Sequence, residues 1–134
     1  IDRIILDSLQ NDGRVTNVAL AAKAGLTAPP CLRRVRALED SGIIRGYHAD
    51  IVDGLPSVSA YLFIRLKSTP APGLIAFLRR MPEVKSCTSL TGDIDLLVEL
   101  SAATTDRVNA LRDRISSHET VADLTTSIVL NRNI

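Results

Sequence analysis

Cysteine and histidine are scarce in this sequence of 134 residues, which contains two of each. Two cysteines, Cys31 and Cys87, are too few for a disulfide framework, and such sparse use of cysteine fits the reducing cytoplasm. There is no Cys-x-x-Cys pattern, and only His48 and His118 are available to join a metal site. We therefore expect neither a structural disulfide nor a metal centre.

Long hydrophobic runs are also missing. No stretch approaches the roughly 18 consecutive apolar residues that suggest a membrane span. The opening Ile1-Asp2-Arg3 has neither the basic nor the apolar segment of a secretory signal. Charged residues make up 23% of the chain, which argues against disorder, and 46% hydrophobic residues suffice for one ordinary core or two small ones. We expect a cytoplasmic globular protein without a membrane partner.

The sequence also lacks recognisable catalytic motifs. No glycine-rich phosphate loop and no Ser-His-Asp order stand out in the sequence. Asp93 and Asp95 have the spacing of a carboxylate pair, but alternate positions of a strand often simply point the same way. Cys87 and His118 are a nucleophile and a base by type, but nothing in the sequence orients them. We expect that the protein is not an enzyme and carries no cofactor.

The basic residues are distributed unevenly, although the net charge of the whole chain is only +1. Residues 1–47 hold seven Lys or Arg against five Asp or Glu, whereas residues 48–134 hold nine against ten. The local excess comes largely from Arg33, Arg34, Arg36 and Arg45. A local basic patch of this kind is what a DNA-facing element needs.

The first part of the sequence predicts three short helices, over residues 2–10, 17–24 and 28–41. Thr16 and Thr27 each precede a helix and offer a hydroxyl as an N-cap, while Gly25 suits the left-handed position after the second helix. Pro29 and Pro30 fall in the first turn of the third helix, where the N–H groups lack an intrahelical acceptor. Three helices with a tight glycine turn between the second and third predict a helix-turn-helix.

A short strand is expected at Ile43–Tyr47, in the position of the wing of a winged helix-turn-helix. Residues 48–57 are rich in Asp, Gly and Pro and are predicted to be a linker, with the domain boundary near Gly54. The sequence therefore predicts a helix-turn-helix domain over residues 1–47 and a second domain over residues 58–134.

The second domain has a different hydrophobic pattern, in which segments typical of strands alternate with segments typical of helices. We expect strands over residues 58–67, 84–90, 94–100 and 121–130, and one helix before each of the second and fourth strands. Thr104 is predicted to cap the second of these helices, and Thr91-Gly92-Asp93 to form a tight turn. The order β-α-β-β-α-β predicts a ferredoxin-like fold, so the whole chain is of the α+β class.

The third helix of the first domain is predicted to have an apolar side and a basic side. At 100° per residue, Cys31, Leu32, Val35 and Leu38 cluster on one side, Arg33 points almost directly away from them, Arg36 lies on the outer half and Arg34 at the border. Arginine can donate two hydrogen bonds to guanine or reach a phosphate. Alternatively, these arginines only solubilise the helix and pair with Glu39 and Asp40. Arg45 and Tyr47 can touch phosphates from the wing or pack within its hairpin.

A resemblance to a known family is carried by dense and collinear motifs, which are 12–17 (DGRVTN), 20–21 (LA), 25–27 (GLT), 30–36 (PCLRRVR), 38–39 (LE), 42–47 (GIIRGY), 81–84 (MPEV), Cys87 and 90–95 (LTGDID). The chain resembles the Lrp/AsnC family, named for the leucine-responsive and asparagine regulators. The resemblance implies a regulator of amino-acid metabolism, with dimers that assemble into octamers and bind amino acids between dimers. Ala19 and Ile94 depart from the family pattern, where glutamate and an aromatic residue are common.

Two sets of site residues follow from the residues together with this resemblance. We expect contacts with duplex DNA from Thr27, Pro30, Arg33, Arg34, Arg36 and Arg45. We expect a small amino-acid-like effector to be bound by Leu90, Thr91, Gly92, Asp93, Asp95, Thr125 and Ser127.

The segment Thr91–Asp95 is the centre of the predicted effector site. The N–H group of Gly92 can take the carboxylate of an amino acid, while Asp93 or Asp95 can pair with its ammonium group. Alternatively the segment is only a hairpin turn. Thr125 and Ser127 are weaker candidates, because threonine in a strand is usually just a good strand former.

The strand over residues 58–67 places Tyr61 and Phe63 on the face opposite Leu62 and Ile64. Two helices cover only one face of a ferredoxin-like sheet, and Leu97 and Val129 add to the other face. An apolar second face argues for burial by a partner, for which a twofold homodimer is the simplest choice. The main alternative function is a small-molecule-sensing regulatory subunit that does not bind DNA, which the arginine-bearing helix disfavours.

Overall fold

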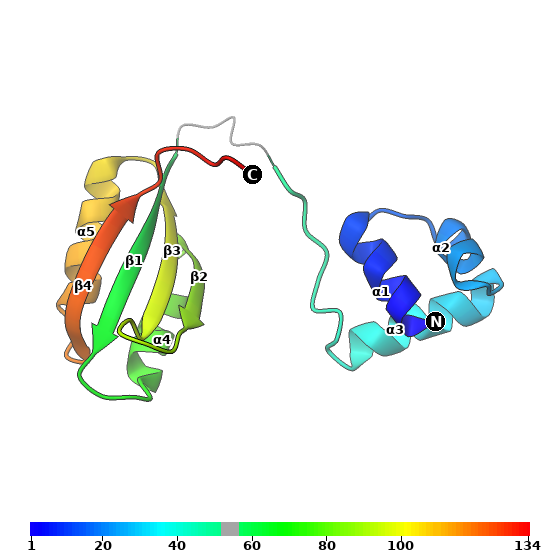
Figure 1. Cartoon of the computed structure of the whole chain (residues 1–134), viewed down its shortest axis with the longest axis horizontal. Coiled ribbons are helices and arrows are strands. Elements are labelled where there is room, and N and C mark those ends of the chain that lie inside the picture. The colour runs from blue at the N-terminus through cyan, green and yellow to red at the C-terminus, as the bar shows by residue number, and fades with distance from the viewer. Residues whose placement is uncertain (52–56) are drawn as a thin grey trace. The chain divides into compact units, whose positions relative to one another are not determined.

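The computed structural model describes residues 1–51 and 57–134, which form two compact units, Ile1–Val52 and Asp53–Ile134 (Figure 1). The boundary predicted at Gly54 lies outside the described residues, as does part of the predicted linker. The first unit contains only helices among its described residues, and the second combines a sheet with two helices. The α+β class is confirmed.

The first unit consists of α1 (Asp2–Asn11), α2 (Asn17–Ala24) and α3 (Ala28–Asp40), as the sequence predicts. The Thr16 side chain accepts a hydrogen bond from the Ala19 N–H at 3.1 Å and so caps α2. Gly25 has φ 70°, a left-handed conformation in which its N–H satisfies the last carbonyls of α2. These two groups fix where α2 begins and ends, and hence the angle at which the chain enters α3.

The cap predicted at Thr27 is confirmed in its position but not in its hydrogen bond. Thr27 occupies the N-cap position of α3, but its side chain makes no capping hydrogen bond. Instead, the Asn17 side-chain amide donates to the Ala28 carbonyl at 2.9 Å, which ties the start of α2 to the start of α3. The sequence pattern missed this contact because it joins residues in two different helices.

The core of the first unit is small and lies between the three helices. Its buried side chains are Ile5, Leu20, Ala21, Ala24, Cys31 and Leu38. The prediction that Leu32 shares the apolar side of α3 is wrong, because 38% of Leu32 is exposed. Cys31, Val35 and Leu38 already form the i, i+4, i+7 row that faces α1 and α2, and Leu32 lies one step of about 100° beyond Cys31.

The strand predicted at Ile43–Tyr47 is also wrong. The chain leaves α3 through a turn in which Gly42 has φ 80° and the Ile44 N–H donates to the Leu38 carbonyl at 3.0 Å. From Arg45 to Ile51 the backbone is irregular. The described part of this unit contains no second strand. Residues 43–47 therefore have no partner for the backbone hydrogen bonds that define a β-strand.

The second unit is a four-stranded antiparallel sheet with two helices on one face (Figure 1). In chain order its elements are β1 (Val58–Leu66), α4 (Pro72–Arg79), β2 (Val84–Ser89), β3 (Leu96–Ala102), α5 (Thr105–Ser116) and β4 (Val121–Ile128). The strands lie in the order β2-β3-β1-β4, with β1 and β3 at the centre. This is the predicted ferredoxin-like arrangement.

The core of the second unit lies between the sheet and the helices. Alternate residues of the central strands face the helices and are buried, namely Ala60, Leu62, Ile64, Leu96, Val98 and Leu100. From the helices they meet Leu74, Leu78, Val108, Leu111 and Ile115. Burying a side chain of this size contributes about 1.5–3 kcal/mol, so this one-sided core is the main source of stability of the unit.

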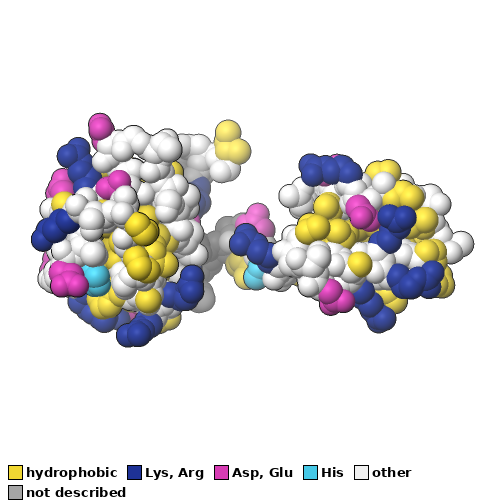
Figure 2. All heavy atoms as spheres, turned by 90° about the horizontal axis from the view of Figure 1, so that it is seen from below, with side chains coloured by type: hydrophobic (Ala, Val, Ile, Leu, Met, Phe, Trp, Pro, Cys, Tyr) yellow, Lys and Arg dark blue, Asp and Glu magenta, His cyan; other side chains and the backbone are white. Residues whose placement is uncertain are grey.

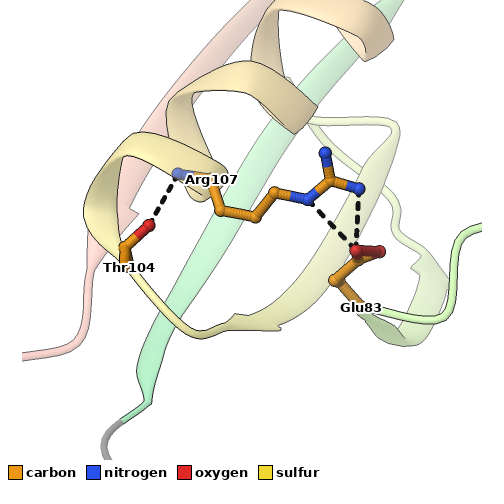
Figure 3. A network of polar contacts seen from close by, with 3 residues as sticks. All are labelled: Glu83, Thr104 and Arg107. Carbon is orange, nitrogen blue, oxygen red and sulfur yellow. Dashed lines mark hydrogen bonds and ion pairs between the residues drawn. The ribbon is translucent and has the colours of Figure 1, made fainter.

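A polar network holds the start of α5 against the segment before β2 (Figure 3). The Thr104 hydroxyl caps α5 by accepting from the Arg107 N–H at 3.1 Å, as predicted. The Arg107 guanidinium donates to one carboxylate oxygen of Glu83 at 3.2 and 2.9 Å. These hydrogen bonds lower the pKa of Glu83, so the network contributes stability above the ordinary pKa of glutamate and loses it as the carboxylate is protonated.

The two threonines at helix starts provide a matched test of capping. Thr16→Ala is expected to lower the free energy of unfolding of the first unit by about 1 kcal/mol, because the Ala19 N–H loses its acceptor. Thr27→Ala is expected to change it by less than about 0.5 kcal/mol, because that hydroxyl makes no capping bond. Urea denaturation followed by circular dichroism measures both. Equal losses would contradict the assignment.

Candidate functional site

The outward face of α3 carries two arginines. The helix packs through Cys31 and Leu38, while Arg33 and Arg36 are exposed. Neither takes part in the ion pairs formed among the described residues. Figure 2 shows Lys and Arg side chains around hydrophobic ones on the surface of the first unit. Two unpaired guanidinium groups on the outer side of a rigid helix are suited to bind an anionic groove.

Arg34 differs from its neighbours. Its guanidinium lies 3.2 Å from a carboxylate oxygen of Asp2, in the first turn of α1, rather than beside Glu39 or Asp40. Both side chains are about half exposed, so the pair contributes at most about 1 kcal/mol. The pair does orient Arg34 along the surface of the unit toward α1, and it leaves Arg33 and Arg36 as the unpaired arginines of the helix.

The other predicted DNA contacts lie at the two ends of α3. Thr27 is exposed at its start and Pro30 is half-buried in its first turn. Arg45 and Tyr47 are exposed on the irregular segment after the helix, not on a hairpin. That segment and α1 border a cavity of about 520 Å³, lined by residues that include Leu6, Leu9, Ile44 and Tyr47. Partial burial there, and the nearby Glu39, raise the pKa of Tyr47.

The loop between β2 and β3 contains most of the predicted effector residues. The Leu90 N–H donates to the Asp95 carbonyl at 2.9 Å, which closes the loop, and Gly92 has φ 99°. Thr91, Gly92 and Asp93 are exposed. The tip thus presents backbone and one carboxylate to solvent, as the sequence predicts for a tight turn.

Asp95 is bound within the unit rather than free. Its carboxylate accepts a hydrogen bond from the Leu66 N–H at 2.7 Å, and its own N–H donates to the Ile64 carbonyl at 3.0 Å. The register of β1 against β4 shifts between Arg65 and Leu66. The Asp95 carboxylate therefore accepts from an N–H at a point where the regular pairing of the strand is interrupted. The sequence did not indicate this bond, because the two residues are 29 positions apart.

A cavity of about 530 Å³ lies beside this loop. Leu90 and Asp95 line it together with Leu66, Thr69, Pro70, Ala71, Pro72, Ile75, Ser89 and Leu96. Its walls therefore come from the ends of β1 and β2, the start of α4 and the beginning of β3. Figure 2 shows a hydrophobic patch on this unit in the view from below. A mostly apolar hollow with one carboxylate and exposed backbone at its border suits a small zwitterion with an apolar side chain.

Thr125 and Ser127 lie on a different surface. Thr125 pairs with Phe63 and Ser127 with Tyr61, so both stand on the face of the sheet that the helices leave open. Within a single chain, the predicted effector residues therefore fall into two groups, one at the β2–β3 loop and one on β4.

The open face of the sheet has an apolar centre beside the ion pair of Glu99 and Arg132. Tyr61, Phe63 and Leu97 are only half-buried there. Glu99 stands beside Tyr61 on the adjacent strand, and the Arg132 guanidinium donates to its carboxylate at 3.1 Å. Hydrogen bonds with Tyr61 and Glu99 raise the pKa of Arg132. The charge of Glu99 is therefore neutralised by the segment that follows β4.

Sequence comparisons divide the chain as the structure does. A winged helix-turn-helix DNA-binding model matches residues 1–45, and the Lrp/AsnC ligand binding domain matches residues 59–133. The chain belongs to the Lrp/AsnC family. The predicted family is thus confirmed, and with it the assignment as a DNA-binding transcription regulator with a ligand-binding domain.

Curated relatives agree with this family assignment. The Rhizobium meliloti leucine-responsive regulatory protein is 42% identical over 107 residues, which cover 76% of this chain and 69% of the relative. The Escherichia coli K12 protein of the same name is 36% identical over 104 residues, or 74% and 63% of the two chains. The match thus spans about two thirds of each of these relatives.

Solved structures share the fold over nearly the whole chain. A Neisseria meningitidis transcriptional regulator, solved as a complex with L-Met, is 35% identical with a TM-score of 0.82, covering 99% of this chain and 90% of that one. Escherichia coli AsnC is 26% identical with a TM-score of 0.78, covering 99% and 92%. In the described part of this chain, no helix has the length and apolar character to span a bilayer.

Replacing Arg33 tests the outward face of α3. If Arg33 contacts a base edge as predicted, Arg33→Ala is expected to weaken binding to the wild-type protein's preferred DNA site by about 1–3 kcal/mol per half-site, the value of one bidentate base contact. Fluorescence anisotropy with a labelled duplex measures the affinity. Arg79→Ala, which removes an exposed arginine of α4, is the matched control and is expected to leave binding unchanged. Unchanged affinity in Arg33→Ala would exclude Arg33 from the interface.

Proposed function

We propose that this Lrp/AsnC protein binds specific duplex DNA through α3 and adjusts that binding to the level of a small amino acid. The observation that carries the proposal is the pair of exposed, unpaired arginines on α3, a helix held in place by the Gly25 turn and the Asn17 hydrogen bond. In a helix-turn-helix the second helix of the motif enters the major groove. Arg33 and Arg36 would meet base edges there, with Thr27 and Arg45 at phosphates.

Arg34 and Pro30 have smaller parts in this proposal. Releasing Arg34 from Asp2 costs little, because the pair is exposed, so a phosphate can capture it. Pro30 shapes the first turn of α3 rather than donating a hydrogen bond, since proline has no N–H. The alternative, a sensing subunit without DNA binding, predicts no salt-dependent affinity for any duplex, whereas phosphate contacts predict a steep loss of affinity with salt.

The working form of the protein is proposed to be a homodimer formed through the open face of the sheet. Half-buried Tyr61, Phe63 and Leu97 would become fully buried there, and Glu99 is already neutralised by Arg132. A twofold dimer presents two α3 helices to a pseudo-palindromic site, which doubles the base contacts. Assembly of such dimers into octamers would place several helix pairs on one DNA. The protein acts where the chromosome is, in the cytoplasm, without catalysing a reaction.

A charge placed on the open face tests the dimer. Phe63→Glu is expected to convert the dimer into a monomer at micromolar concentration, because an unpaired carboxylate would be buried at the interface. Light scattering measures the mass. Thr125→Glu, at an exposed position opposite Phe63, is a second variant that disturbs the folded chain less. Ala76→Glu on α4 is the control and is expected to stay dimeric. A monomeric wild-type protein would contradict the proposal.

The effector is proposed to be a small amino acid with an apolar side chain, bound at the cavity beside the β2–β3 loop. The cavity walls are mostly apolar. The adjoining tip of the loop, outside the cavity lining, carries the exposed Gly92 and Asp93, whose N–H and carboxylate are the two kinds of group that a zwitterion needs. The related regulator solved with L-Met suggests methionine as the first ligand to test. Thr125 and Ser127 would contribute from a neighbouring chain of the assembly, since within one chain they stand on the open face.

Calorimetry with methionine and the other amino acids tests this site. Asp93→Asn and Gly92→Val are expected to weaken binding at least about tenfold, by removing an ion pair or distorting a backbone that requires positive φ. Asp106→Asn, an exposed carboxylate of α5, is the control. Asp95→Asn is less informative because Asp95 also binds the Leu66 N–H. Unchanged binding in both loop variants would place the effector elsewhere.

A further inference from the structure

Leu32 is exposed at a position where an apolar side chain is unexpected. It lies in the first half of α3, and 38% of its surface is accessible. Leu32 does not belong to the packed core of the unit, which takes Cys31, Val35 and Leu38 from the same helix. The side chain therefore contributes less to the stability of the free protein than the fully buried leucines do.

The neighbours of Leu32 on the helix surface are the residues proposed to meet DNA. Arg33 follows it directly, and Arg36 lies one turn further on, at the i, i+4 spacing that places two residues on the same face. Pro29, three residues before, is exposed as well. Pro29 and Leu32 thus form a short apolar strip at the start of α3, bordered by two unpaired guanidinium groups.

The chemistry of DNA leaves one favourable partner for such a strip in the major groove. Phosphates and the polar edges of bases offer nothing to an isobutyl group. The C5-methyl group of thymine is apolar, and it projects into the major groove. Residues near the N-terminus of a recognition helix are those that reach base edges.

We propose that Leu32 contacts the methyl group of a thymine adjacent to the base pair that Arg33 contacts, and so makes this protein select thymine at one position of each half-site. The inference rests on the proposed insertion of α3 into the major groove. Arg33 would supply the hydrogen bonds, and Leu32 would supply discrimination between thymine and cytosine, whose C5 carries no methyl group.

Uracil provides a direct probe, because it pairs with adenine as thymine does and lacks only the methyl group. The duplex is the site that the wild-type protein selects from a random library, with each thymine replaced in turn by deoxyuridine. At one thymine per half-site, the replacement is expected to lower wild-type affinity about fourfold, the loss for one buried methyl group. Leu32→Ala is expected to bind the thymine and uracil duplexes equally.

Two further variants separate the contact from general effects. Leu32→Met keeps an apolar side chain of similar volume and is expected to retain much of the preference for thymine. Val18→Ala, at an exposed apolar position of α2, is the matched control and is expected to discriminate as the wild type does. Thermal unfolding followed by circular dichroism verifies that Leu32→Ala is folded, which the exposure of Leu32 favours.

The outcomes distinguish this inference from the proposed function. A wild-type protein that selects no DNA site would overturn both. Specific DNA binding that depends on Arg33 but shows no thymine at which uracil weakens affinity would overturn only the role of Leu32. A preference for thymine that persists in Leu32→Ala would have the same consequence, since another group would then read the methyl. Loss of the preference in Leu32→Ala alone supports the proposal.

Discussion

One-sided burial is the constraint on which both units depend. Two helices cover a four-stranded sheet on one face only, and three short helices bury only the sides that face one another. Each unit therefore keeps one outer face that its own elements do not cover. In the second unit this is the face with Tyr61 and Phe63, and in the first it is the face with Arg33 and Arg36. A small domain has no further elements with which to cover such a surface, so the faces proposed to bind DNA and a second chain are the ones that its core leaves uncovered.

The elements were predictable where a local pattern determines them. The capping threonine Thr16, the left-handed Gly25 and the alternation along β1 each act over a few residues, so the three helices and the sheet follow from the sequence. The strand expected at Ile43–Tyr47 failed because a strand requires a partner, and the described residues of that unit supply none. Leu32 was misplaced because the angular position alone puts it near the apolar stripe, whereas only the packing of three helices decides how wide that stripe is.

The polar contacts of the sites were less predictable, because they join residues far apart in the sequence. Arg34 is predicted to contact DNA, with pairing inside its own helix as the alternative, yet its partner in the folded chain is Asp2 of α1, at a separation of 32 residues. Asp95 was expected to be free for a ligand, yet its carboxylate accepts from the Leu66 N–H. Residue type indicated correctly that these groups form polar contacts. Only the tertiary arrangement decides which of them remain available, and it leaves Arg33, Arg36 and Asp93 exposed.

Under the proposed function, the hydrogen bond between Asp95 and Leu66 would connect the ligand site to the proposed dimer interface. Leu66 ends β1, the strand that presents Tyr61 and Phe63 on the open face, and the register of β1 against β4 shifts beside it. In the proposed site the ammonium group pairs with Asp93, which lies two residues before Asp95 on the same loop, so a bound ligand would act on the loop whose carboxylate holds the end of β1. A ligand at the loop would therefore act on the strand that carries the proposed interface. Coupling requires only that the ligand bind more tightly to one of two arrangements of this strand end. A difference in binding free energy of about 1–3 kcal/mol would suffice to shift the assembly.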